Sequence, residues 1–143
     1  MIDPLPKLSV VSGVDVLAAG FSLLRGNKEL IVGQEAQDEI EEKLVDSGLV
    51  VRLAREGFVS FVVVGPKSES VHDAIDDEQE SHDLLGPLTT WHDDDEPEDI
   101  ASLIVVSVRS QALAELVFIV DDRHDADRRL KAELQAALRG SGN

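Results

Sequence analysis

The clearest hydrophobic run in the chain predicts a β-strand at Phe58–Val64. This run is apolar on both faces, so we expect it to be a central strand, and Gly65 and Pro66 end it. A second apolar run, Leu49–Ala54, precedes it across the short glycine-containing segment Arg55–Gly57. Two strand-like runs with such a connection are typical of a β-hairpin. The pattern therefore predicts a hairpin over residues 49–64.

Two more runs rich in β-branched residues predict a second pair of strands. They are Ser102–Arg109 and Glu115–Val120. The segment between them, Ser110–Ala114, is read either as a loop or as a single helical turn.

Three other segments have apolar residues at helical spacing. The first runs from about Gly13 to Arg25, behind a capping box that begins at Ser12. The second ends at Gly48, and the third ends at Gly140. The apolar stripes consist of Val14, Leu17, Phe21 and Leu24 in the first helix, Ala36, Ile40, Leu44 and Val45 in the second, and Ala126, Leu130, Leu134, Ala137 and Leu138 in the third.

This order of elements predicts an α+β fold with a mostly antiparallel sheet of about four strands. The helices are expected to pack on one face of that sheet, with a long acidic loop between the two hairpins. Strands and helices do not alternate in this prediction, so we do not expect a doubly wound nucleotide-binding sheet. Residues 1–143 are read as one domain, in which residues 66–100 are an acidic, largely solvated insertion.

The negative charge of the chain is concentrated in one segment. The sequence has 29 acidic and 13 basic residues, a formal net charge of −16, and 13 of the acids lie in Glu69–Asp99, which contains no lysine or arginine. The remaining 112 residues carry 16 acids and 13 bases, a balance of −3. Repulsion between like charges and the scarcity of apolar residues favour a solvated loop, with at most one short helix from Ser70 toward Leu84.

Charge and composition also exclude several classes of protein. A phosphate backbone and an anionic lipid surface would repel this chain, so we expect no direct nucleic-acid binding and no membrane binding, and basic protein surfaces are favoured instead. The absence of cysteine excludes disulfides, cysteine zinc sites and cysteine nucleophiles. The start, Met1–Pro6, lacks the pattern of a signal peptide. We therefore expect a cytoplasmic or particle-associated protein.

Composition gives a prediction about the source of the protein. Asp (16) exceeds Glu (13), Arg (8) exceeds Lys (5), and aromatic residues are scarce. That pattern is typical of salt-adapted cytoplasms, although salt adaptation normally spreads carboxylates over the whole surface.

No sequence motif identifies a reaction. The serines have no G-x-S-x-G surroundings, and no lysine follows a glycine-rich loop, so we expect a non-catalytic protein without a cofactor. Every histidine precedes an aspartate, and His72, His82 and His92 are ten residues apart, which makes them candidate metal ligands. Ten-residue spacing does not put these side chains on one helix face, so the prediction is no metal site.

The candidate partner-binding residues surround the only tryptophan. An aromatic side chain beside charge is a common interface anchor, and Trp91 stands directly before the densest acidic run. The alternative is that Trp91 packs this loop back onto the sheet. The acidic run has the wrong spacing for an EF-hand, because Pro97 has no side-chain oxygen. The full candidate set is Trp91, Asp93, Asp94, Asp95, Glu96, Glu98 and Asp99.

The predicted order of elements suggests a function. The strands within Leu49–Val64, the run Thr89–Trp91 leading to Ser102–Val108, and the last helix together resemble the tail-terminator and neck ring proteins of tailed viruses. That resemblance implies a non-catalytic assembly subunit that forms homo-oligomers and contacts other assembly proteins. The alternative is an acidic inhibitor, immunity protein or secretion-type chaperone that binds a basic partner protein.

Overall fold

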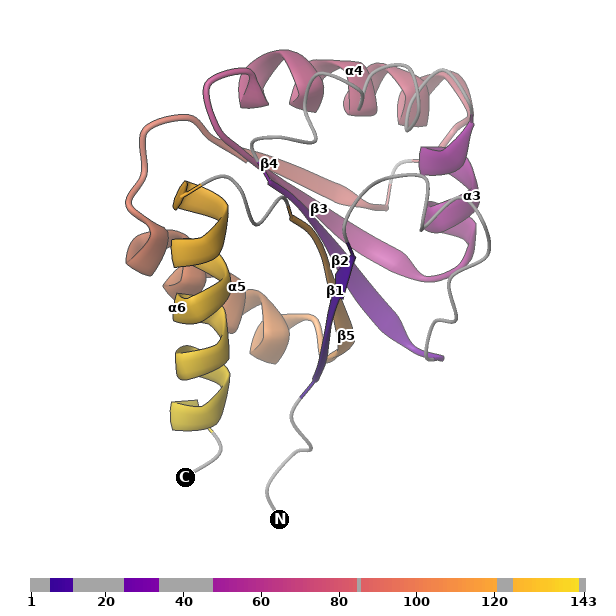
Figure 1. The fold of residues 1–143 in the computed structure, drawn as a ribbon. Coiled ribbons are helices and arrows are strands. Elements are labelled where there is room, and N and C mark those ends of the chain that lie inside the picture. The colour runs from indigo at the N-terminus through magenta and orange to yellow at the C-terminus, as the bar shows by residue number, and fades with distance from the viewer. Residues whose placement is uncertain (1–5, 12–24, 34–47, 85, 121–124, 142–143) are drawn as a thin grey trace.

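The protein is a five-stranded sheet with helices on both faces (Figure 1). The computed structural model describes residues 6–11, 25–33, 48–84, 86–120 and 125–141. The elements in chain order are β1 (Lys7–Val11), β2 (Asn27–Val32), α3 (Leu49–Arg55), β3 (Phe58–Val64), α4 (Ser68–Ser81), β4 (Leu88–His92), α5 (Pro97–Ser110), β5 (Leu113–Ile119) and α6 (Asp125–Ser141).

All strands of the sheet are parallel, in the order β1-β5-β2-β3-β4. The predicted mostly antiparallel sheet is therefore wrong. Parallel neighbours need a crossover instead of a tight turn, and helices provide it here: α3 precedes β3, α4 joins β3 to β4, and α5 joins β4 to β5. The alternation of strands and helices that the sequence pattern did not show is thus present, and a doubly wound arrangement should not have been excluded.

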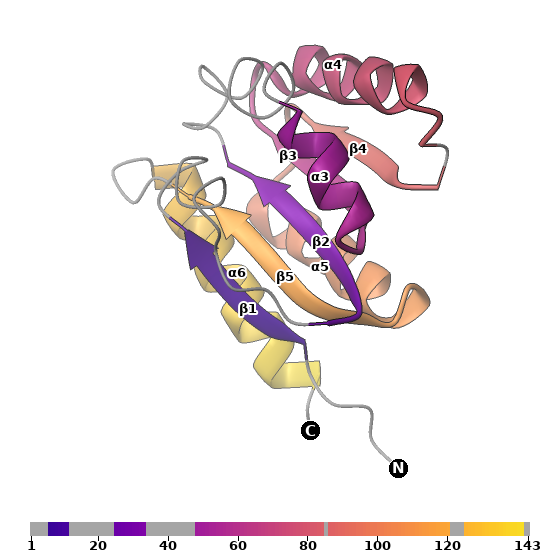
Figure 2. The same ribbon diagram turned by 90° about the vertical axis from the view of Figure 1, so that its right-hand side faces the viewer.

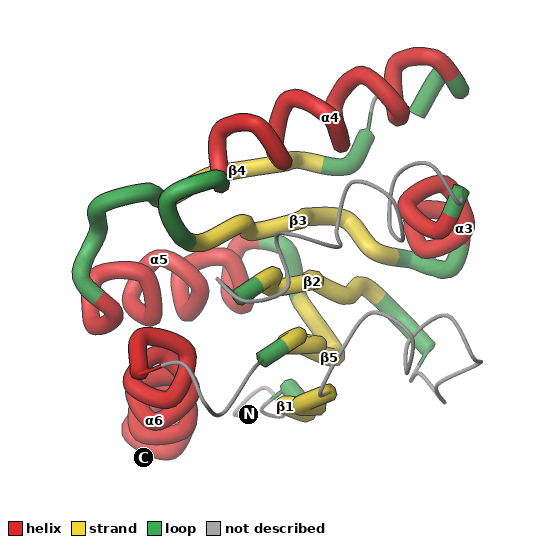
Figure 3. The backbone as a smooth tube through the Cα atoms, turned by 45° about the horizontal axis from the view of Figure 1, so that its top comes forward, coloured by secondary structure: helices red, strands yellow, loops and turns green. Residues whose placement is uncertain are grey.

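The helices cover both faces of the sheet, which corrects the prediction of a single covered face. Figures 2 and 3 show α3 and α4 on one side and α5 and α6 on the other. Each side has its own apolar core. Phe61 and Val117 belong to the core under α3 and α4, whereas Val62 and Phe118 belong to the core under α5 and α6. Both faces of the sheet are buried, as is usual for parallel sheets.

Residues 49–55 form helix α3, so the predicted hairpin with β3 is wrong. Leu49, Val50 and Leu53 are buried against the sheet at helical spacing. The apolar β-branched composition of this run resembles a strand, but a parallel β2–β3 pair needs a crossover at this point. Tertiary context has overridden local propensity here.

Residues 97–110 form helix α5, which corrects the predicted strand Ser102–Arg109. Pro97 begins the helix, where a backbone N–H would have no partner within the helix and its absence therefore costs no hydrogen bond. Glu98 and Asp99 follow in the first turn, where the helix dipole favours acidic side chains. Ile100 and Ile104 are buried one turn apart. These start signals lie just before the β-branched run, within the segment 66–100 for which the charge pattern predicts a loop.

The acidic segment is structured, which corrects the predicted long acidic loop at residues 66–100. It contains α4, β4 and the first turn of α5. The short helix expected from Ser70 is part of α4, which begins two residues earlier and ends at Ser81.

Three predicted elements are confirmed. Phe58–Val64 is β3 and is buried along nearly its whole length. The predicted strand Glu115–Val120 corresponds to β5, and the last predicted helix corresponds to α6. The two other predicted helices fall in residues 12–24 and 34–47, which lie outside the described residues.

Candidate functional site

The acids of residues 69–80 lie on the outward face of α4. Ser68, Val71, Ile75 and Gln79 are the buried residues of this helix, spaced three or four residues apart, and they face the sheet. The helix lies over β4 and β3 (Figure 3). The carboxylates therefore project from a packed helix and not from a loop. Those at exposed positions are Glu69, Asp73, Asp77 and Glu80, and Asp76 and Glu78 are half-buried.

The second acidic stretch is the turn between β4 and α5. All of its predicted partner-binding acids are exposed. Asp95 Oδ2 accepts a hydrogen bond from His92 Nδ1 at 2.7 Å, which ties the turn to the end of β4. Glu98 and Asp99 lie in the first turn of α5 and complement its dipole. Part of the charge at this site therefore also stabilises the helix.

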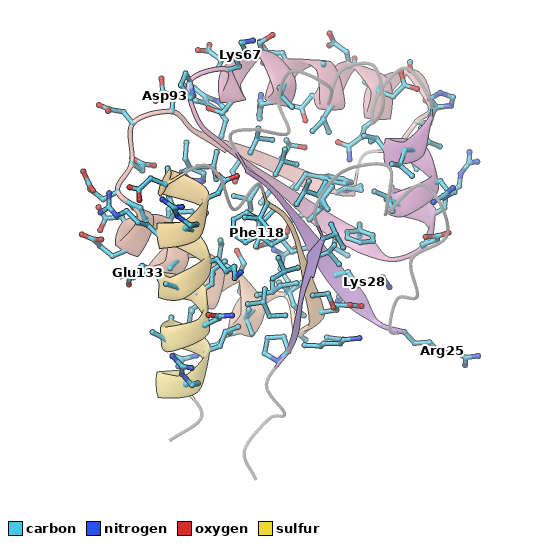
Figure 4. The ribbon with its side chains drawn as sticks, in the orientation of Figure 1. Arg25, Lys28, Lys67, Asp93, Phe118 and Glu133 are labelled. Carbon is cyan, nitrogen blue, oxygen red and sulfur yellow. The ribbon has the colours of Figure 1, made fainter. Side chains whose placement is uncertain are left out.

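The two acidic stretches are neighbours in space. Gly65, which follows β3, donates its N–H to the carbonyl of His92 at 2.9 Å. The segments after β3 and β4 thus both start at the carboxyl ends of these parallel strands, where Figure 4 labels Lys67 and Asp93. We call the outward face of α4 together with residues 93–99 the acidic surface.

Trp91 lies beside the acidic surface, on the edge strand β4. Its register partner is Val63, whose side chain belongs to the core under α3 and α4, so Trp91 is on the α4 side of the sheet. Its exposed fraction is 37%. Part of the Trp91 surface is therefore in solvent, and its role as an interface anchor stays a prediction.

The three histidines proposed as weak metal candidates are each paired with acids one to four residues away along the chain. His72 contacts Asp73 at 3.0 Å and Asp76 at 3.3 Å, and His82 contacts Glu78 at 3.1 Å. Within the described residues, no three His, Cys, Asp or Glu side chains converge on a common point that could hold a metal ion.

The strand order reverses between β2 and β5, where parallel sheets usually bind ligands. Here Gly33 closely follows β2, and its N–H bonds the carbonyl of Ile119 at 2.9 Å. A Cβ on Gly33 would lie 2.4 Å from Oδ2 of Asp127, an α6 side chain that is 1% exposed. Asp127 therefore fills the space beside Gly33.

Sequence reasoning missed a buried carboxyl group on β2. Glu29 is fully buried on the α5 and α6 side of the sheet, where the hydroxyl of Ser60 donates a hydrogen bond to its Oε2. Its other oxygen, Oε1, has no hydrogen-bond partner in the part of the chain that the structure describes. Burial raises the pKa of Glu29 to about 7, against the opposing effect of the Ser60 bond. An acid directly before the apolar run Leu30–Val32 was the available signal.

A second buried carboxyl group lies on the opposite face. Ser9 on β1 donates a hydrogen bond of 2.6 Å to Glu115 on β5. The β2 residue in register with Glu115 is Lys28, which is 2% exposed and donates to the carbonyl of Gly26 at 2.9 Å. These polar groups lie at the start of the strands, away from the acidic surface.

Comparison with known proteins gives a family. The sequence profile of a domain of unknown function, DUF7684, matches residues 25–140. The chain belongs to the DUF7684 family. The match runs from just before β2 into α6, so it includes the whole acidic surface of this DUF7684 member and leaves β1 outside. No curated protein and no solved structure gives a significant match. None of the described helices has the length and apolar character needed to cross a membrane.

Proposed function

We propose that this protein is a non-catalytic binding module that docks on a basic surface of a partner protein through its acidic surface and Trp91. The observation that carries the proposal is the rigid display of carboxylates on α4 and on the β4–α5 turn. A flexible acidic loop would lose chain entropy on binding, whereas a packed helix presents its charges already ordered. Complementary charge of this kind steers association and selects partners.

The geometry thus favours the predicted alternative, a protein that binds a basic partner, over the ring subunit. The resemblance to tail-terminator and neck proteins rested on an order of elements with strands at residues 49–54 and 102–109. Those segments are α3 and α5. The residues that carried the resemblance therefore no longer support it.

Removing charge from the acidic surface is expected to weaken binding to an octalysine peptide about tenfold. The test variant is Asp73→Asn, Asp77→Asn and Glu80→Gln on α4. Three exposed charge contacts contribute about 0.2–1 kcal/mol each, and the loss should shrink as salt screens them. Titration calorimetry at low and at physiological ionic strength measures both effects.

The matched control removes three exposed acids from other places. It combines Glu56→Gln, Asp125→Asn and Glu133→Gln, so its net charge equals that of the test variant. We expect the control to bind the peptide nearly as tightly as the unmodified protein. Equal losses in the two variants would show that only total charge matters and would refute the proposed binding surface.

A second candidate function, a self-associating assembly subunit, is favoured by one observation on α5. Leu103 and Val106 are large apolar side chains with exposed fractions of 52% and 62%. If α5 is a contact between copies, light scattering should give a defined oligomer, and Leu103→Ser with Val106→Ser should convert it to a monomer. A monomer for the unmodified protein in both dilute and multimolar KCl would eliminate this candidate.

A further inference from the structure

Within the described residues β4 pairs with a strand on one side only, so the backbone N–H and C=O groups of its other side have no strand partner there. In a parallel pair, every second residue directs its N–H and C=O to the neighbouring strand, and the residues between direct theirs to the other side. His92 bonds toward β3, since its carbonyl accepts from Gly65. By alternation Leu88 and Thr90 also face β3, so Thr89 and Trp91 direct their N–H and C=O groups away from β3; Thr89 is 9% exposed and Trp91 is 37% exposed.

Sequence features that commonly prevent pairing are missing from the β4 edge, although helix α4 packs over this strand. Edge strands commonly carry a charge, a proline or a bulge that prevents another strand from adding. Residues 88–91 contain neither charge nor proline, and the β3–β4 register is regular over all five pairs. The opposite edge, β1, begins with the exposed Lys7.

The charge and apolar surface around the β4 edge indicate which kind of peptide segment could bind there. Asp93–Asp95 directly follow β4, and the acids of α4 lie above it. Apolar surface is present on both sides of the strand, because Leu88 is 56% exposed on the α5 side and Trp91 is 37% exposed on the α4 side. A segment with an uncharged, alternating core and basic residues at one end complements both features.

We propose that the β4 edge binds an extended segment of a cationic partner protein as a sixth strand, paired with Thr89 and Trp91 and with its basic end against Asp93–Asp95. This inference rests on the proposed function, because it specifies how the basic partner is held. Backbone hydrogen bonds to β4 would fix the position of the added strand, and the acidic surface would favour a partner segment with basic residues.

The test uses two probe peptides, each with five alternating valine and threonine residues and three lysines at either the N-terminal or the C-terminal end. The control peptides have the same sequences with every core amide N-methylated, which preserves charge and side chains but removes all core donors. We expect the better unmethylated peptide to bind at least about tenfold more tightly than its methylated form. Amide exchange followed by NMR should slow at Thr89 and Trp91 and stay unchanged at Leu88 and Thr90.

The outcomes separate this inference from the proposed function. Equal affinity of methylated and unmethylated peptides, with unchanged exchange at Thr89 and Trp91, would overturn strand addition and leave charge docking intact. If a peptide without lysines bound as tightly as one with them, strand addition would stand and the charge-based function would fail. Absence of binding by both lysine peptides at millimolar concentration would reject the sixth strand.

Discussion

Ile104→Ala is expected to lower the free energy of unfolding by about 2–5 kcal/mol, whereas Val106→Ala should change it by less than about 0.5 kcal/mol. Both residues belong to α5, but Ile104 is 1% exposed and Val106 is 62% exposed. The first substitution leaves a cavity between α5 and the sheet. The second removes an exposed apolar group and places a better helix former at that position. Urea denaturation of both variants measures the difference.

This pair also separates the helix from the strand that the sequence suggested. In a strand, residues 104 and 106 would lie on the same face, so the two substitutions would both be costly or both be mild. In a helix they are about 200° apart, and only one can face the core. Similar destabilisation by Ile104→Ala and Val106→Ala would therefore contradict the helix α5.

Strong local patterns were sufficient to predict some of the elements. Phe58–Val64 is too apolar and too rich in β-branched residues for an exposed helix, and the stripe containing Leu130 and Leu134 has a clear helical period. In α5 the run Leu103–Val108 is also β-branched, and only its acidic and proline-containing start identifies it as a helix. Composition alone predicted the wrong element there.

The direction of the strands could not be read from local pattern. β5 lies between β1 and β2, although 80 residues separate it from β2 along the chain. The position of β5 depends on pairing with strands that are distant in the sequence, and no turn motif predicts that pairing. Once α3 and α5 were read as strands, the helical crossovers disappeared, and an antiparallel sheet was the consistent result.

The sequence shows that the acids of the candidate site are concentrated in one segment, but it does not predict how the structure arranges them. The inner stripe of α4 is half polar, since Ser68 and Gln79 share it with Val71 and Ile75. Its helical period was therefore only partly visible, and the dense charge suggested a loop. Similarly, β4 is short and contains two threonines, so Trp91 was singled out as an anchor without the strand that holds it.

Glu29→Gln is expected to stabilise the protein by about 3 kcal/mol at pH 8 and to have little effect at pH 4.5. A shift of the pKa from 4.5 to about 7 corresponds to roughly that free energy, because one pKa unit is 1.36 kcal/mol. Below pH 4.5 the carboxyl group is protonated in both the folded and the unfolded states. Between 4.5 and 7 the folded state keeps the proton that the unfolded state loses, so the free energy of unfolding falls as pH rises.

Above about pH 7 the folded protein must hold an ionised carboxylate that has one oxygen without a partner among the described residues. Glutamine is neutral at every pH and can still accept the bond from Ser60. The contributions of all other acids cancel when the free energy of unfolding of the unmodified protein is subtracted from that of Glu29→Gln at each pH. Glu133→Gln, on the exposed side of α6, is the matched control and should give a nearly flat difference. A flat difference for Glu29→Gln as well would mean that the folded protein solvates this carboxylate, and that burial does not raise its pKa.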